Sequence, residues 1–404
     1  MKLWSVVACD QYTSEPDYWK AVNELTDGKP STLYVTVPEI YLNDADIEER
    51  IAKTNLTMQQ YMEDAIFTEH KNTYIYVERT LQNGVKRLGI VGKVDLEDYD
   101  YSIGSQTKVR ATEGTVVSRI PPRLKVRRDA PIELPHIMLL IDDNAKEIIE
   151  PNQKLTDTFE KVYDFELMQN SGHIKGYKMS EEAASRLEDK LINLADIHQF
   201  NKKYEVEKDS PLVFAMGDGN HSLATAKANY ENLKKEIGEE AAKNSPARYA
   251  LCELVNLHDD SLVFEAIHRV IFDANGDEFI KMLEETYTVS YDADAKGQSF
   301  VFVFHGEQKK ITITDSKEYL TVATLQKLLD RFVAEKGGEI DYIHGENVVE
   351  SLCENPNNFG IILEAMDKAD LYKSVILDGA LPRKTFSMGD ACDKRFYTEA
   401  RKIK

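Results

Sequence analysis

The chain has 404 residues, of which 42% are hydrophobic, so it can bury the cores of two domains or of one large domain. It contains 50 Lys and Arg residues and 70 Asp and Glu residues, which gives a formal net charge of -20. This balance argues against non-specific binding to nucleic acids or anionic membranes, and an anionic ligand therefore requires a local group of basic residues.

The cysteines and the N-terminal sequence indicate the cellular compartment that we expect for the protein. Cys9, Cys252, Cys353 and Cys392 are far apart and have no zinc-site spacing, which predicts a reduced, cytoplasmic protein. The first apolar run meets an acid at Asp10, so it is too short for a signal peptide. No stretch approaches the roughly 18 apolar residues of a membrane span, and we expect no membrane partner.

The first elements are a strand and a helix. Residues 3–9 predict a buried strand, and residues 14–17 have the Ser, Pro and acids of a helix start. Asp10, Gln11 and Tyr12 lie between them, where open α/β sheets place ligands. An ordinary polar loop is an equally good interpretation.

The next segment contains a helix and a hairpin. Residues 33–37 predict a strand, and residues 44–67 predict an amphipathic helix. Residues 74–81 and 88–94 flank the turn pair Asn83-Gly84, which is typical of a β-hairpin.

Residues 108–128 are basic in an otherwise acidic chain, with Glu113 as the only acid. Arginine side chains grip phosphate or carboxylate with two parallel hydrogen bonds. We therefore favour a phosphate pocket over a solvated basic face. The basic residues singled out are Arg110, Arg119, Arg123, Lys125, Arg127 and Arg128.

A strand-to-helix turn follows a predicted strand at 135–142 and a predicted helix at 180–200. The apolar residues 212–216 suit a buried strand, and a helical sequence begins after Gly217-Asp218-Gly219-Asn220-His221-Ser222. Glycines allow a sharp turn, and the N-terminus of a helix favours anions. The turn predicts a functional site, although an ordinary α/β connection fits the local pattern equally well.

The second half contains a smaller unit. Residues 249–257 predict a strand or a short helix. Residues 262–272 are an apolar run that contains His268 and Arg269. Charged side chains in such a run need a partner, so the pair is expected either to contact a ligand or to form a structural ion pair. From residue 273 the pattern is that of an α+β unit, with a helix near 278–286, strands at 300–304 and 311–314, and a helix at 322–333. We expect domains at 1–272 and 273–404, and a charged helix after Gly389.

The segment 216–227, MGDGNHSLATAK, resembles domain-of-unknown-function family 1015. The segments ATEGTVVSRIPPRLKVRRDAPIELPHIMLLIDD, LVNLHDDSLVFEAIHRVIF and LPRKTFSMGDA also resemble this family and occur in its order between about residues 100 and 390. The turn is also similar to the Asp-Gly-His-x-Arg motif of free-serine kinases in the ParB/sulfiredoxin-like superfamily. Asn220 and Ser222 stand where His and Arg are common, and Thr112 stands where much of family 1015 has His.

The resemblance implies an α/β (α+β) fold, with a mixed-sheet N-terminal domain related to ParB/sulfiredoxin-like folds and a smaller α+β C-terminal unit that contributes to the site. It implies binding of a nucleotide or pyrophosphate and phosphorylation of a small hydroxylated metabolite, with serine the first to test. The phosphoryl donor would be ATP, ADP or pyrophosphate, and the cation Mg²⁺.

Phosphoryl transfer requires a carboxylate and positive groups around the phosphate. Asp218 is the expected base or Mg²⁺ ligand, with Glu113 and His221 as further catalytic candidates. The expected phosphate or substrate contacts are Arg110, Arg119, Arg123, Asn220, Ser222, His268, Arg269 and Lys384. A non-catalytic binding or regulatory protein for a phosphorylated metabolite is the alternative, and a nucleic-acid partner is disfavoured by the charge. The oligomeric state is left open.

Overall fold

The computed structural model describes residues 2–102, 104–134 and 136–404, and its contacts divide the chain into two compact units. Unit 1 runs from the N-terminus to Leu262 and resumes at Gly389–Lys404, and unit 2 is Val263–Met388. The division falls before the expected boundary after residue 272, because strand β10 (Phe264–Ala266) pairs with β17 (Phe386–Met388) inside unit 2.

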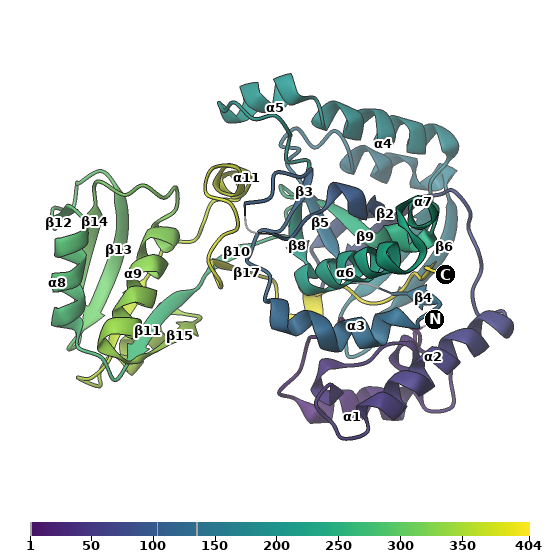
Figure 1. Ribbon diagram of the computed structural model, residues 1–404, viewed down its shortest axis with the longest axis horizontal. Helices are drawn as coiled ribbons and strands as arrows, with labels where there is room; N and C mark the ends of the chain where they lie inside the picture. Colours follow the sequence, from purple (N-terminus) through teal and green to yellow (C-terminus); the bar gives the residue numbers. More distant parts are fainter. Residues whose placement is uncertain (1, 103, 135) are drawn as a thin grey trace. The chain divides into compact units, whose positions relative to one another are not determined.

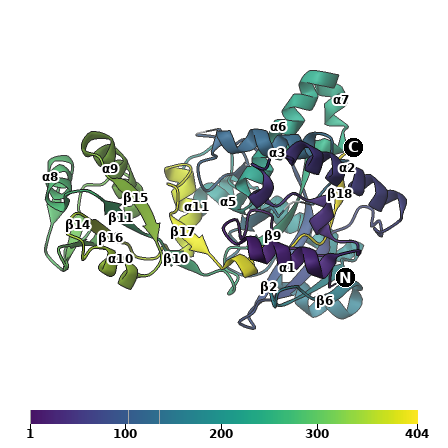
Figure 2. The same cartoon turned by 90° about the horizontal axis from the view of Figure 1, so that it is seen from below.

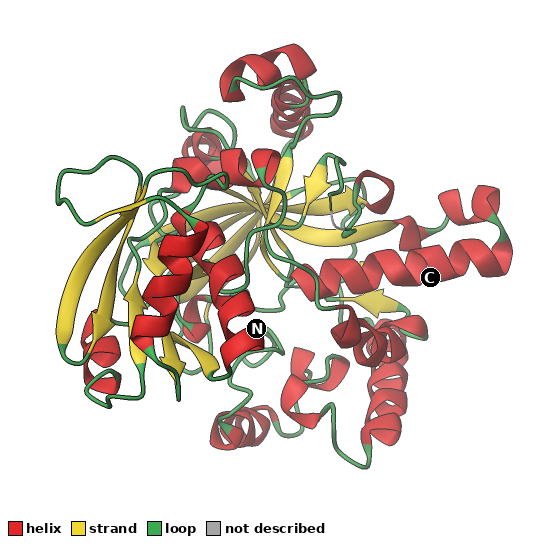
Figure 3. Ribbon diagram, turned by 60° about the vertical axis from the view of Figure 1, so that its left-hand side comes forward, coloured by secondary structure: helices red, strands yellow, loops and turns green. Residues whose placement is uncertain are grey.

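Unit 1 is built on an eight-stranded mixed sheet with the strand order β3-β8-β5-β9-β2-β1-β7-β6 (Figures 1 and 3). The pairs β3–β8 and β5–β9 are parallel, and the other neighbours are antiparallel. The strands are β1 Ile75–Thr80, β2 Lys86–Asp95, β3 Val109–Arg110, β5 Met138–Ile141, β6 Glu160–Glu166, β7 His173–Lys178, β8 Phe214–Asp218 and β9 Tyr249–Asn256. The expected mixed-sheet α/β fold is confirmed.

The two faces of this sheet are covered by different helices. Successive side chains of a strand point to opposite faces, so Tyr76 belongs to one hydrophobic core and its neighbours Ile75 and Val77 to the other. The Tyr76 core includes α4 and α6, and the other core includes α1 and α2 (Figures 1 and 2). The helices are α1 Pro16–Thr26, α2 Ile47–Glu63, α3 Ile120–Arg128, α4 Glu181–Leu194, α5 Ile197–Tyr204, α6 Asn220–Ile237 and α7 Glu239–Lys243.

Two predicted strands near the N-terminus are wrong. Residues 3–9 make only an isolated bridge, Val7 with Phe396, and residues 33–37 contribute to the 3-10 helix Thr32–Val35. Long-range backbone hydrogen bonds hold the first segment to two different parts of the chain: the carbonyl of Trp4 accepts from the N–H of Thr32 at 2.8 Å, and the N–H of Ala8 donates to the carbonyl of Arg395 at 2.9 Å. The helix at 44–67, the hairpin and the strand at 135–142 are present, although Pro135 lies outside the described residues.

The segment Gly389–Lys404 is not the expected charged helix. It contains the short 3-10 helix Ala391–Asp393 and the strand β18 (Arg401–Lys402), which pairs with β4 (Ile132–Glu133). Its charges are satisfied by buried carboxylates of unit 1: Arg395 pairs with Glu253, and Arg401 with Glu133. These ion pairs hold the segment in an extended path along the unit.

Unit 2 is built on a six-stranded antiparallel sheet with the order β12-β14-β13-β16-β11-β15. Helices α8 and α9 pack on one hydrophobic core, and α10 packs on a smaller one. Its further elements are β11 His268–Phe272, β12 Val289–Ser290, β13 Gln298–Phe304, β14 Glu307–Ile313, β15 Glu339–Ile343, β16 Phe359–Ile362, α8 Gly276–Thr286, α9 Thr321–Lys336, α10 Glu346–Leu352 and α11 Lys368–Leu377. In the described part of the chain, no helix combines the length and the hydropathy that a bilayer crossing requires.

Candidate functional site

The turn between β8 and α6 depends on Gly219. Strand β8 ends at Asp218, α6 begins at Asn220, and Gly219 between them has a φ of 78°. A Cβ at Gly219 would lie 2.9 Å from the Cα of Ile137, so another residue is opposed both by conformation and by the neighbouring backbone. The carboxylate of Asp218 accepts the Gly219 N–H at 2.8 Å, which places it at the start of α6.

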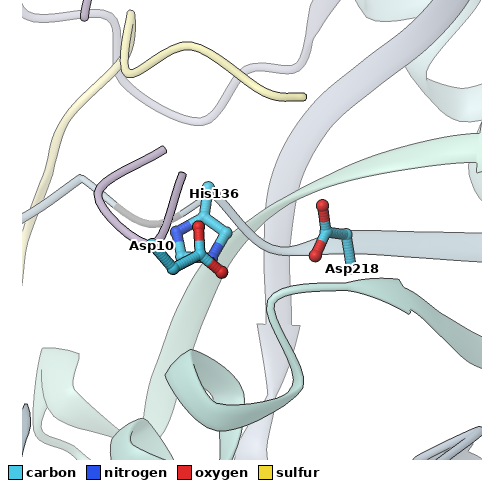
Figure 4. A group of neighbouring side chains, drawn as sticks. All are labelled: Asp10, His136 and Asp218. Atoms are coloured by element: carbon cyan, nitrogen blue, oxygen red, sulfur yellow. The ribbon is translucent and has the colours of Figure 1, made fainter. Parts of the chain in front are cut away.

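Asp218 belongs to a group of three potential ligands with Asp10 and His136 (Figure 4). Asp10 comes from the loop before α1, and His136 from the segment before β5, next to Asp218 because β5 and β8 are antiparallel neighbours. One side-chain atom of each residue lies within 4.8 Å of the others. Three segments far apart in the sequence thus bring two carboxylates and an imidazole together.

Hydrogen bonds fix the orientation of the His136 ring. Its Nε2 lies 3.5 Å from Oδ2 of Asp10, and its Nδ1 lies 3.1 Å from the hydroxyl of Tyr397. The Tyr397 hydroxyl also accepts the N–H of Cys9 at 2.9 Å. His136 is buried, with 4% of its surface exposed, so these contacts decide which nitrogen faces the two carboxylates.

Acidic and basic side chains lie side by side in the group. Burial opposes ionisation of Asp10, but the charge and hydrogen bond of His136 hold the pKa of this carboxyl well below its usual range. Burial lowers the pKa of His136, and Asp10 outweighs this effect and raises the pKa above its ordinary value. Lys394 places its Nζ 3.5 Å from Oδ2 of Asp218. The group therefore holds two carboxylates with two basic side chains.

Asn220 and His221 at the start of α6 hold the loop that precedes α3. The side-chain amide of Asn220 donates to the carbonyl of Glu113 at 3.2 Å, and the N–H of Val116 donates to Nε2 of His221 at 3.3 Å. Thr112 supports the same loop by donating its hydroxyl to the carbonyl of Met216 at 2.8 Å. The polar residues of the turn therefore position a loop, and Glu113 meets Asn220 through its backbone.

Two arginines act on His221 through their charge. Burial, followed by the charges of Arg123 and Arg119, lowers the pKa of His221 to about 4, so this imidazole is neutral at physiological pH. Arg123 is itself ion-paired with Glu39, and Arg119 is exposed. Of the expected basic residues, Arg119 and Arg123 thus lie in the electrostatic neighbourhood of the turn.

Arg110 is hydrogen-bonded to backbone carbonyls outside the β8–α6 turn. Its buried guanidinium donates to the carbonyls of Thr107 at 2.8 Å, Gln106 at 3.1 Å and Ser210 at 3.2 Å. The side chain joins two backbone segments of unit 1, which differs from the expected role as a phosphate ligand. Ser222, another expected contact, lies half-buried in the first turn of α6.

The remaining expected residues, His268, Arg269 and Lys384, belong to unit 2. Nδ1 of His268 accepts the N–H of Leu363 at 3.2 Å. The buried guanidinium of Arg269 donates to Gln326 at 3.2 Å and to the carbonyl of Lys384 at 3.0 Å, among other carbonyls. These contacts are structural hydrogen bonds to an amide and to backbone groups, which differ from the ion pair expected as the structural interpretation of His268-Arg269.

The sequence did not single out His136 or Tyr397, it placed Lys394 only in a basic C-terminal cluster, and it marked Asp10 only as a loop residue. His136 lies inside the predicted strand at 135–142, as part of an apolar run, and Lys394 was assigned to a charged helix. A polar residue at the end of a strand is the one local signal that His136 offers. A second group of potential ligands, Asp390, Cys392 and Asp393, lies within the segment Gly389–Lys404.

Comparisons with known proteins give one family and several distant structures. No curated protein matches the sequence. A free serine kinase mutant in complex with AMP aligns with a TM-score of 0.41 and 12% identity, covering 78% of this chain and 92% of that one. A conserved hypothetical protein from Pyrococcus furiosus aligns with a TM-score of 0.37 and 11% identity over 78% of this chain and 95% of that one.

SbnI from Staphylococcus aureus, with a C-terminal truncation, aligns with a TM-score of 0.38 and 7% identity, covering 74% of this chain and 82% of that one. The family model described as "Protein of unknown function (DUF1015)" matches residues 1–332, which is most of the chain. The chain therefore belongs to the DUF1015 family of proteins of unknown function.

Proposed function

We propose that unit 1 binds a nucleotide or pyrophosphate at the β8–α6 turn and transfers a phosphoryl group to the hydroxyl of a small metabolite, with serine the first candidate. The observation that carries the proposal is the position of Asp218 at the start of α6, 3.5 Å from Lys394. A helix N-terminus and an ammonium group both favour phosphate oxygens, and a carboxylate beside them can receive a hydroxyl proton.

The reaction assigns a role to each group. The hydroxyl oxygen forms a bond to the terminal phosphorus of the donor while the bond from that phosphorus to the bridging oxygen breaks. The leaving phosphate or diphosphate group keeps the electron pair, and Asp218 accepts the hydroxyl proton. Lys394, with Arg119 from the loop before α3, neutralises charge on the phosphates.

A divalent cation gives Asp218 an alternative role, as a ligand that would hold the ion together with Asp10. Their oxygens are ligands of the kind that hard cations prefer, and both belong to the group of potential ligands described above. When bound, such a cation supplies charge neutralisation at the phosphoryl group.

The test is to incubate the protein with serine, Mg²⁺ and ATP, ADP or pyrophosphate in turn, and to assay for phosphoserine. We expect product with at least one donor and a large loss of activity in Asp218→Asn. Asp27→Asn, an exposed acid at the end of α1, is the matched control and should leave the rate unchanged. Absence of phosphoserine with all three donors would exclude serine as the acceptor.

The alternative is a non-catalytic sensor of a phosphorylated metabolite. It is favoured by the fact that Arg123 is already paired with Glu39 and that Asn220 and His221 already hold a loop, which leaves fewer groups for a transferring phosphate. This function would be supported if pyrophosphate raises the melting temperature without turnover, and if it raises that of Asp218→Asn by the same amount.

A further inference from the structure

We propose that Asp10, His136 and Asp218 together bind one divalent cation of the zinc and cobalt type, with His136 as a direct ligand. This inference deepens the proposed function, because it concerns the same site and assigns the class of its cation. The proposal stands on geometry: the three side chains come from three different segments, and their ligand atoms lie within 4.8 Å of one another.

The spacing of the donor atoms suits a single ion. Zinc binds imidazole nitrogen and carboxylate oxygen at about 2.0–2.2 Å, which places two donors on one ion roughly 3–4 Å apart. The 3.5 Å between Nε2 of His136 and Oδ2 of Asp10 falls in this range. The third donor, a carboxylate oxygen of Asp218, lies within 4.8 Å of the other two.

The surroundings of His136 are those of a metal ligand. A ligating histidine usually donates its other ring N–H to a fixed partner, which sets the tautomer and the ring orientation. Here Nδ1 faces the hydroxyl of Tyr397 at 3.1 Å, so Nε2 is the nitrogen presented to Asp10. The hydroxyl is fixed in turn by the backbone N–H of Cys9.

The imidazole decides between classes of cation. Carboxylates and water alone suit Mg²⁺, whereas a site with imidazole suits zinc and its transition-metal neighbours. His136 is buried and points its Nε2 toward the carboxylates, so an ion bound there meets nitrogen as well as oxygen. The site therefore favours Zn²⁺ or Co²⁺ over Mg²⁺.

Lys394 is the competitor for this ion. Its ammonium lies 3.5 Å from Oδ2 of Asp218, where it balances the charge that a bound metal would balance. Binding of a dication requires the lysine to move away from this oxygen, which a flexible four-carbon side chain can do. The affinity for metal thus depends on a residue that is not a ligand.

The group Asp390, Cys392 and Asp393 is the rival site within unit 1. Its three residues come from one short loop, Asp390 is exposed, and burial raises the pKa of the Cys392 thiol, which disfavours the thiolate that binds metals. It also differs in chemistry, because a thiolate bound to Co²⁺ absorbs in the near ultraviolet and a site of oxygen and nitrogen ligands does not.

The experiment is a titration of the EDTA-treated full-length protein with Co²⁺, followed by absorbance, and with Zn²⁺ and Mg²⁺, each followed by calorimetry. We expect one equivalent to bind without a thiolate band, and Asp10→Asn and Asp218→Asn each to weaken binding about ten-fold or more. His136→Gln should narrow the preference for Zn²⁺ over Mg²⁺. The double variant Asp390→Asn/Cys392→Ser should bind like the unmodified protein.

Several results would overturn the proposal: no binding of either metal, unchanged affinity in both Asp10→Asn and Asp218→Asn, or a thiolate band that disappears with Cys392→Ser. Because removing Asp10 also breaks its ion pair with His136, circular dichroism and thermal unfolding of each metal-free variant identify loss of fold. The titrations contain neither donor nor serine, so metal binding and phosphoryl transfer can each fail alone.

Discussion

Nζ of Lys394 lies 3.5 Å from Oδ2 of Asp218 and connects the end of the chain to the β8–α6 turn. The backbone around Lys394 is held by two buried arginines of the hairpin: Arg79 donates to the carbonyls of Cys392 and Lys394, and Arg87 to the carbonyl of Asp393. Three successive carbonyls thus accept hydrogen bonds from buried arginines, and the ammonium of Lys394 reaches Asp218 from this hydrogen-bonded segment.

Replacing Lys394 should have opposite effects on the binding of pyrophosphate and of Zn²⁺. Lys394→Gln should weaken pyrophosphate binding about ten-fold or more, equivalent to a charge-assisted hydrogen bond of about 1.5–3 kcal/mol. The same change should strengthen Zn²⁺ binding, because the competing ammonium is gone. Calorimetry with each ligand measures both effects, and Lys53→Gln, at an exposed lysine of α2, is the control that should alter neither. A change in the same direction for both ligands would contradict this arrangement.

The requirement for glycine at position 219 can be measured as stability. Gly219→Ala should lower the free energy of unfolding by about 1–3 kcal/mol, because alanine is strained at a φ of 78° and its Cβ would contact the Ile137 backbone. Gly28→Ala is the matched control, with a φ of 66° and open space, and should lose only about 1 kcal/mol. Urea unfolding of both variants compares them directly. An equal loss of unfolding free energy in the two variants would show that the contact with Ile137 does not contribute to the effect of Gly219→Ala.

The low pKa of His221 predicts how stability changes with pH. In the folded protein this imidazole stays neutral down to about pH 4, whereas in the unfolded chain it takes up a proton below about 6.5. The unfolded state therefore binds more protons between these values, and His221 makes the protein less stable as the pH falls through this window.

His221→Gln should make the decline in stability between pH 6.5 and pH 4 shallower, while glutamine can still accept the N–H of Val116. Urea unfolding at a series of pH values measures the slope for both proteins. His198→Gln, at an exposed position of α5, serves as the comparison for loss of a histidine elsewhere. An identical slope in His221→Gln and the unmodified protein would refute the assigned pKa.

Local sequence patterns correctly predicted the helices, hairpin and turn whose formation depends on neighbouring residues. The helix predicted at 44–67 is α2, and the predicted hairpin is β1–β2. The strand, turn and helix predicted at 212–229 are β8 and α6. The N-terminal strand was predicted wrongly, and the backbone hydrogen bonds of its segment to Thr32 and Arg395 are contacts that no local pattern reveals.

The candidate site was predicted only in part for the same reason. The turn identified Asp218, and the loop position drew attention to Asp10, but His136 and Lys394 reach them through tertiary contacts alone. Arg110 shows a second limit of the sequence, because a basic residue in a basic segment gives no sign that backbone carbonyls will accept hydrogen bonds from its Nε and Nη2 atoms.

Arg79 provides a test of whether the fixed backbone matters to the site. Arg79→Lys leaves a positive charge but cannot bond the carbonyls of Cys392, Lys394 and Ser171 together, since a single ammonium lacks the guanidinium fork. If Arg79 acts by positioning Lys394, this variant should weaken pyrophosphate binding in the unmodified background and have little further effect in Lys394→Gln. The double-mutant cycle from calorimetry gives the coupling between the two residues. Additive losses would mean that Arg79 supports the fold alone, because only a positioning role requires the ammonium of Lys394 to be present.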